Sequence, residues 1–121
     1  DDLLIRQTRG SWPNSFRTAR MIPAVEYIQA NRVRTMLMGA LEAALEGIDV
    51  FITPTRAPDV SLMTNLTGHP AVVVPSGFNA DGTPVSIVFI GQLWADAETL
   101  RVAKAWQDAT DFHTRRPPLF G

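Results

Sequence analysis

The chain has 121 residues, 45% of them hydrophobic, which is enough for one small globular core and little more. The chain has eleven basic and twelve acidic residues. Its net charge of -1 gives no overall attraction for nucleic acid or for an anionic membrane. With no cysteine and only two histidines, the sequence excludes disulfides, thiol nucleophiles and a structural zinc site, and it predicts neither a metal nor a cofactor.

The opening segment, residues 1–20, has no sustained hydrophobic period and is predicted to be an irregular arm. It begins with Asp1 and not with methionine, so we expect the natural start of the protein to lie upstream, and the compartment stays open. Residues 1–34 hold six arginines against three acids, which is typical of a solvated or ion-paired surface. No run in the chain approaches the ~20 apolar residues that a membrane-spanning helix needs.

A long helix is predicted from Pro23, at the first helical position, to a stop at Gly47. Its apolar residues recur at spacings of three and four, so one face is expected to pack against a core. The residues of this face are Ile22, Val25, Val33, Met36, Leu37, Ala40, Leu41, Ala44 and Leu45.

Three short apolar runs are predicted to be strands, at residues 48–54, 71–74 and 85–91. The second is expected to end at Pro75 and to pair in antiparallel fashion with the third, because only a short, turn-rich loop joins them. Residues 55–63 are predicted to be a loop, followed by a single helical turn at 64–68. The order of helix, tight turn and strand favours an α/β fold over a helical bundle.

A second helix is predicted after Gly91, with Asp96 as its N-cap and Glu98 near the positive end of its dipole. Residues 111–121 are expected to form an extended tail, which leaves 21–110 as the α/β core. Two helices can scarcely cover both faces of a sheet whose strands are apolar on both sides, so a layer is missing from the chain. The apolar stripe of the second helix consists of Leu100, Ala103, Trp106 and Ala109.

Local chemistry alone does not identify a reaction. Ser76 is a candidate nucleophile with His69 or His113 as its base, but no G-x-S-x-G turn surrounds it. The alternative for Ser76 is a turn residue that bonds its own backbone. The sequon at residues 65–67 directly precedes a turn into a buried strand, which disfavours glycosylation there.

Five segments, in order, resemble the C-terminal portion of the amidase signature family. The similarity runs from about Glu26 to Thr110, and Pro117-Pro118-Leu119-Phe120 fits the usual end of such chains. The matching segments are EYIQANRVRT, IDVFITPT, NLTGHPAVVVPSGF, DGTPVSIVFIG and ETLRVAKAWQDAT.

The resemblance implies an amidohydrolase that cleaves carboxamide C–N bonds with a serine nucleophile, a second serine on a cis peptide bond, and a lysine. The family's lysine segment and its Gly-Ser-Ser-Gly-rich segment have no counterpart here, and the sole lysine, Lys104, has the period of a solvent-facing residue. No catalytic residue is therefore assigned to this chain, and the segment alone is expected to be inactive.

The resemblance also implies the fold, a large mixed sheet layered between helices. This chain would be a fragment of it with a long helix, about three core strands and a C-terminal helix, and the rest of the enzyme would cover both faces of residues 71–74. The expected partners are the remainder of the parent chain, a small amide substrate in that parent, and a second copy that meets an uncovered apolar face. The candidates for the wall of the substrate pocket are Thr53, Pro54, Thr55, Thr64 and Asn65, which stand where α/β enzymes line a cleft.

Several alternatives stay open. The candidate pocket residues could instead satisfy backbone groups of their loops. Ser86 stands where many family members have a glycine after Pro-Val, and this departure, with the lack of a basic face, favours a free-standing amidase over a tRNA-dependent amidotransferase A subunit. From a different class, the chain could be a self-standing α/β binding or assembly module without catalysis, with its arginine-rich arm as the contact surface.

Overall fold

The structure is a computed structural model that describes residue 8 and residues 10–117. The chain forms two compact units, Asp1–Met36 and Leu37–Gly121. Helix α3 (Ala24–Ala44) contributes its first part to one unit and its last part to the other. Within the described residues, no helix is both long and apolar enough to cross a membrane.

Helix α2 (Trp12–Ala19) forms inside the segment that the sequence predicts to be an irregular arm. Pro13 lies in its first turn, where the missing N–H costs no hydrogen bond. Trp12 and Phe16 lie one turn apart, and their ring centroids are 5.7 Å from each other. The helix buries none of its residues. The rest of the predicted arm, residues 1–7 and 9, lies outside the described part of the chain.

Helix α3 confirms the prediction of a long helix, although Pro23 precedes the helix and does not occupy its first position. The carbonyl of Pro23 accepts hydrogen bonds from two N–H groups of the first turn, at 3.0 and 3.1 Å. Beyond the helix, Gly47 has a φ of +76°, a conformation that favours glycine. The predicted apolar face is largely unburied, since Leu41 is the buried residue of the helix and Met36 is 74% exposed.

Three strands form one antiparallel sheet: β1 (Val50–Pro54), β2 (Ala71–Phe78) and β3 (Pro84–Gly91). β3 lies between the other two, so β1 and β2 are the edges of the sheet and run parallel to each other. Both edge strands begin beside the end of β3, because Val50 pairs with Gly91 and Ala71 with Ile90. The α/β fold class and the antiparallel pairing of β2 with β3 are confirmed.

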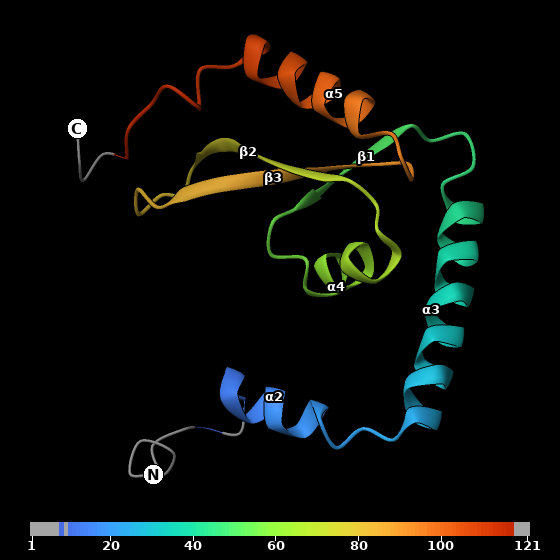
Figure 1. Ribbon diagram of the computed structural model, residues 1–121. Coiled ribbons are helices and arrows are strands. Elements are labelled where there is room, and N and C mark those ends of the chain that lie inside the picture. The colour runs from blue at the N-terminus through green and yellow to red at the C-terminus, as the bar shows by residue number, and fades with distance from the viewer. Residues whose placement is uncertain (1–7, 9, 118–121) are drawn as a thin grey trace. The chain divides into compact units, whose positions relative to one another are not determined.

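Helix α4 (Pro58–Thr67) connects β1 to β2 and occupies most of the segment predicted to be a loop. The loop prediction is wrong because Pro58 lies at the start of the helix and does not interrupt it. The helix ends at Gly68, which has a φ of +85° and donates its N–H to the carbonyl of Thr64 at 2.8 Å. Figure 1 shows α4 and the C-terminal helix α5 (Asp96–Ala109) on opposite faces of the sheet.

Strand β2 continues past Pro75, where the sequence predicts its end. The register shifts between Pro75 and Gly77, which marks a bulge, and Pro75 is tolerated because β2 is an edge strand. The loop to β3 is a tight turn in which Asn79 and Thr83 are hydrogen-bonded and Gly82 has a φ of +80°.

Helix α5 covers one face of the sheet and supplies much of the core. Val74, Phe89 and Ala103 form a buried cluster, and Trp106 packs against it. The ring centroids of Phe89 and Trp106 are 6.3 Å apart, in the tilted geometry that aromatic pairs favour. The core of the unit therefore lies between α5 and the strands β2 and β3.

The first turn of α5 approaches the end of β3 very closely. Thr99 is fully buried, and its Oγ1 donates to the carbonyl of Ala95 at 2.8 Å. A side chain at Gly91 would collide with Oγ1 of Thr99, so this approach requires glycine. Two details of the helix prediction are wrong: Asp96 is the first helical residue and not the N-cap, and Leu100 is 57% exposed because Thr99 faces the sheet instead.

A single side chain joins the end of β3 to the turn between α3 and β1. The Nε2 group of Gln92 donates two hydrogen bonds, to the carbonyls of Leu45 and Ile48, each at 2.8 Å. These carbonyls belong to the turn that leaves α3, in which the carbonyl of Leu45 also accepts the N–H of Ile48 at 2.9 Å. Gln92 thus fixes the entry to β1.

The second face of the sheet is covered unevenly. Thr53, Val88 and Val73 lie side by side across the three strands. Thr53, on β1, is buried, whereas Val73, on β2, is 57% exposed. The chain therefore covers the β1 side of this face and leaves the β2 side open, so the expectation that residues 71–74 are covered on both faces is not met within this chain.

Candidate functional site

The five candidate pocket residues come from two segments. Thr53, Pro54 and Thr55 are at the C-terminal end of β1, beside the turn between β2 and β3. Thr64 and Asn65 are in the last turns of α4, the helix that precedes β2.

A polar pocket of about 510 Å³ lies at the hairpin end of the sheet. Two of the candidates, Pro54 and Thr55, line it, and Thr55 Oγ1 donates a hydrogen bond of 2.6 Å to the carbonyl of Ser86. This bond ties the segment after β1 to β3. The remaining lining residues, which sequence reasoning did not single out as a pocket wall, are Arg56, Asn79, Asp81, Thr83, Pro84, Val85 and Ser86.

The charges of this pocket come from Arg56 and Asp81. The backbone N–H of Thr83 donates to Asp81 Oδ1 at 3.0 Å, and this hydrogen bond lowers the pKa of Asp81 below its usual value. The carboxylate is therefore ionised at neutral pH. With one cation, one anion, an amide and hydroxyl groups, the pocket can bind a small polar molecule, but it presents no nucleophile paired with a base.

Two of the other candidates, Thr64 and Thr53, donate hydrogen bonds to nearby backbone carbonyls. Oγ1 of Thr64 donates to the carbonyl of Ser61 at 3.2 Å, within α4, and Thr53 is buried with its Oγ1 3.4 Å from the carbonyl of Pro54. Asn65 is exposed on α4. For the two threonines, the structure agrees with the alternative in which they satisfy backbone groups.

His69 is buried between α4 and β2, and nothing in the sequence indicates how closely it is held. Its Nδ1 lies 2.8 Å from Thr67 Oγ1, which itself donates to the carbonyl of Met63 at 2.9 Å. Because that hydroxyl uses its proton on Met63, Nδ1 must carry the hydrogen. Nε2 is buried and has no hydrogen-bond partner among the described residues, and burial lowers the pKa of His69.

The alternative of a serine hydrolase built on Ser76 and His69 is not supported by this geometry. His69 precedes the start of β2, and Ser76 lies beyond the bulge, so about 20 Å of extended strand separates them. Nδ1 of His69 is engaged with Thr67, and no hydrogen bond joins the two residues in the part of the chain that the structure describes.

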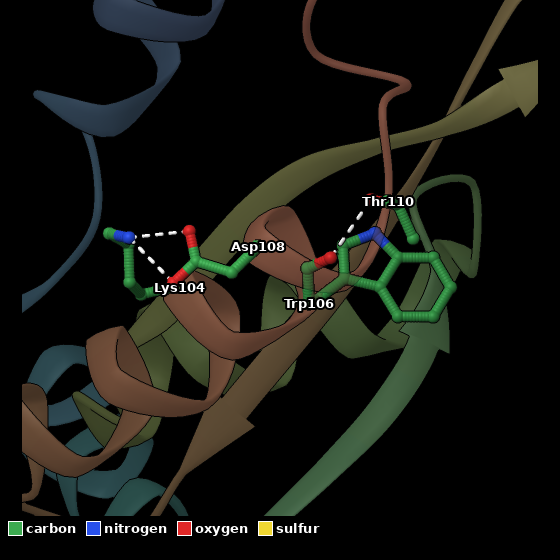
Figure 2. Close-up of polar contacts among 4 residues, drawn as sticks. All are labelled: Lys104, Trp106, Asp108 and Thr110. Carbon is green, nitrogen blue, oxygen red and sulfur yellow. Dashed lines mark hydrogen bonds and ion pairs between the residues drawn. The ribbon is translucent and has the colours of Figure 1, made fainter.

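Lys104 lies on the solvent side of α5, as its period predicts. Figure 2 shows its Nζ between the two carboxylate oxygens of Asp108, at 2.5 and 2.6 Å, one turn further along the helix. Both side chains are mostly exposed. At the C-cap of this helix, Thr110 Oγ1 donates to the carbonyl of Trp106 at 2.8 Å (Figure 2). Lys104 is therefore a surface residue in an exposed ion pair.

Two further features of the described residues bear on chemistry. No peptide bond among them is cis, so the family's cis serine has no counterpart there. No group of three or more histidine or acidic side chains among them is placed to hold a metal ion.

Comparison with known proteins gives no matching family model. The chain is 37% identical over 111 residues to a protein of Synechococcus sp. (strain JA-2-3B'a(2-13)). This match covers 77% of the present chain and 22% of the Synechococcus protein. It is 38% identical over 112 residues to a protein of Desulforudis audaxviator and 35% identical over 111 residues to one of Ralstonia nicotianae. All three are named as the A subunit of glutamyl-tRNA(Gln) amidotransferase, which is a member of the amidase signature family.

This sequence belongs to the amidase signature family. The resemblance noted from five short segments is thereby confirmed. The amidase signature chain described here spans about 22% of the length of the relatives it matches.

Proposed function

We propose that this chain is part of an amidase signature enzyme that cleaves the C–N bond of a carboxamide. The observation that carries the proposal is the identity of 33–38% to amidotransferase A subunits over about three quarters of the chain. In such an enzyme, a serine oxygen attacks the amide carbon, the amine leaves, and an acceptor nucleophile such as water releases the acyl group. The serine pair and the lysine would come from sequence outside this chain.

In that enzyme, this chain would have a structural role and would also provide one polar wall of a pocket. The sheet and α5 form a core of their own, and the hairpin end presents Thr55, Arg56 and Asp81 around a pocket. The uneven cover of the sheet supports a parent in which further polypeptide lies over the β2 side. The chain by itself would be inactive, because its described residues hold no nucleophile next to a base.

The names of the relatives favour a second, finer candidate, an amidotransferase A subunit, over the free-standing amidase that Ser86 suggests. Ser86 is half-buried, and its carbonyl accepts the hydroxyl of Thr55. That contact uses a backbone group, which a glycine at this position would also offer. Ser86 therefore gives little reason to prefer the free-standing amidase.

Exchange of this chain into a relative tests the proposal. The matching segment of the Synechococcus protein would be replaced by this chain, and ammonia release would be measured from glutamine and from simple carboxamides. We expect a folded chimera that retains hydrolysis, and a control chimera with Gly91→Val that loses it, because the valine would collide with Thr99. A chimera that folds but hydrolyses no amide would overturn the proposal.

The same assay separates the alternatives. Activity that depends on the amidotransferase partner subunits would support the second candidate, whereas activity on simple amides without them would support a free-standing amidase. The isolated chain is expected to show no hydrolysis of either substrate. Ordering of the arginine-rich arm on a partner protein would instead favour a self-standing binding module.

A further inference from the structure

His69 lies in an enclosed site at the junction of α4 and β2. It follows Gly68, the C-cap of α4, and precedes β2, which begins at Ala71. The residue is only 5% exposed, and two threonines from the last turns of α4, Thr64 and Thr67, are buried with it. The imidazole ring is therefore surrounded by protein and not by water.

The hydrogen bonds of this junction leave one ring nitrogen without a partner. Thr67 Oγ1 donates to the carbonyl of Met63, so it accepts from His69, and the neutral ring carries its hydrogen on Nδ1. Nε2 is then an acceptor, yet it meets no donor in the part of the chain that the structure describes. Unsatisfied buried nitrogen atoms are rare in native folds, because each one costs free energy.

The enclosure of Nε2 does not depend on polypeptide outside this chain. Residues of the chain itself shield the atom, so an added segment could reach it only after the junction had opened. A longer enzyme that contains this chain could bury the ring further. It could not give Nε2 a hydrogen-bond partner in this conformation.

No charged side chain stands ready to balance a charge on the ring. The strands β1, β2 and β3 carry no charged residue, and the one charged residue of α4, Asp59, lies at the opposite end of the helix. The acids in the first turn of α5 are Asp96 and Glu98, and among the described residues neither is bonded to His69. Burial, and not a neighbouring charge, lowers the pKa of His69.

A proton on Nε2 would give the closed junction a charge and a donor that it cannot satisfy. The β2 side cannot move away easily, because the N–H of Gly91 holds the carbonyl of Pro70 at 3.1 Å and the ladder with β3 continues from Ala71. The α4 side can. Gly68 has a φ of +85°, and a hydrogen bond from its N–H to Thr64 closes the last turn of the helix.

We propose that the junction of α4 and β2 is a pH-sensitive switch, in which protonation of His69 at Nε2 opens the last turn of α4 while the sheet stays closed. The step is the transfer of a proton from solvent to the lone pair of Nε2; Nδ1 keeps its hydrogen, and no other covalent bond forms or breaks. Loss of that proton closes the junction again. The switch does not rest on the proposed function and goes beyond it.

The sign of the effect follows from the buried, neutral ring. The open junction exposes His69 to water and returns its pKa to the ordinary 6.5, whereas the closed junction holds the pKa lower. The closed form is therefore fully favoured above pH 6.5 and loses its advantage as pH falls through the lower, closed-state pKa.

Hydrogen exchange of the full chain at two pH values tests the switch, with the intrinsic exchange rate at each pH divided out. Protection of the amides of Thr67 and Gly68 is expected to fall at least about threefold from about pH 7 to 5. The amides of Val102 and Ala103, in α5, are expected to keep their protection. An equal loss in α5 would mean that the whole fold opens, which would overturn the proposal.

Two variants identify the titrating group. His69→Gln removes the titrating ring and keeps a polar side chain, so protection in the last turn of α4 is expected to be the same at both pH values. Thr64→Ser changes the same turn without removing its hydroxyl, and it is expected to retain the pH-dependent loss. A loss of protection that persists in His69→Gln would overturn the proposal.

Nitrogen NMR of the imidazole ring on the unmodified chain provides a second test, in case His69→Gln fails to fold. At neutral pH, Nδ1 is expected to carry the hydrogen and Nε2 to be bare, and the ring is expected to titrate below pH 6.5 together with the loss of amide protection. A neutral ring with its hydrogen on Nε2, or a titration at or above pH 6.5, would contradict the switch.

Discussion

Helices α5 and α3 have the same kind of sequence pattern but differ in how many of their residues are buried. Both carry apolar residues at helical spacing, yet α5 buries Thr99 and Ala103 within 14 residues, whereas α3 buries Leu41 alone within 21. Hydrophobicity does not explain the contrast, because Val33 on α3 is as apolar as Val102 on α5 and is exposed. An apolar stripe is buried only where it meets an opposing surface, and α5 packs against the sheet.

The largest expected effect lies under α5. Phe89→Ala should destabilise the fold by about 3–5 kcal/mol, because it removes a fully buried ring from the cluster against Trp106. Val33→Ala, on α3, should change stability by less than about 0.5 kcal/mol. Urea unfolding followed by circular dichroism measures both. Equal losses at the two positions would contradict the contrast between the helices.

Two glycine substitutions should have opposite signs. Gly91→Ala should cost about 1–3 kcal/mol, because the new methyl group collides with Thr99 beneath α5. Gly39→Ala, in α3, meets no atom within 4 Å and should stabilise the helix by about 0.5–1 kcal/mol. Thermal melts of the two variants provide the measurement, and a stabilising Gly91→Ala would refute the close packing of α5.

Trp106→Phe should have a smaller effect. Phenylalanine keeps an aromatic ring against Phe89 but cannot donate to the carbonyl of Pro75, and the lost hydrogen bond is worth about 0.5–1.5 kcal/mol. Trp94→Phe is the matched control, because Trp94 is almost fully exposed. The difference between the urea midpoints of Trp106→Phe and Trp94→Phe measures how much the hydrogen bond from Trp106 to Pro75 stabilises the fold. Identical midpoints would contradict a stabilising role for this bond.

The smallest effect concerns pH. Burial holds the pKa of His69 below its ordinary 6.5, so the folded chain binds fewer protons than the unfolded chain under mildly acidic conditions. Stability from this group is therefore full above pH 6.5 and is lost as pH falls through the lower, folded pKa. His69→Gln should flatten the dependence of stability on pH between about pH 7 and 5. If the pH dependence of stability remains in His69→Gln, it arises from other titratable groups.

Much of the fold could be predicted from periodicity and turn residues. The long helix, the three strands and the antiparallel hairpin follow from spacing, glycines and prolines. Helix α4 could not, because proline is common both in loops and at helix starts, and only its position at the first turn distinguishes the two. Thr99 was missed in favour of Leu100, since hydrophobicity cannot reveal that a glycine on β3 makes room for a hydroxyl.

The candidate site was less predictable than the fold. Pro54 and Thr55 could be proposed because they follow a strand, and they do line a pocket. Arg56, Asn79 and Asp81 join them from a loop and a hairpin turn, and no sequence pattern places these two segments side by side. Thr64 and Asn65 also stand beside a strand in the sequence, but they lie in helix α4 and do not line this pocket.

The two hydrogen bonds of Gln92 carry a consequence for the order of folding. They join residues 47 and 44 positions apart in the sequence, so they can form only after a long loop has closed. The turn between α3 and β1 has a local hydrogen bond of its own, from the N–H of Ile48 to the carbonyl of Leu45 at 2.9 Å. We therefore expect the turn to form together with α3, and to become fixed against the sheet only when β3 brings Gln92 to it.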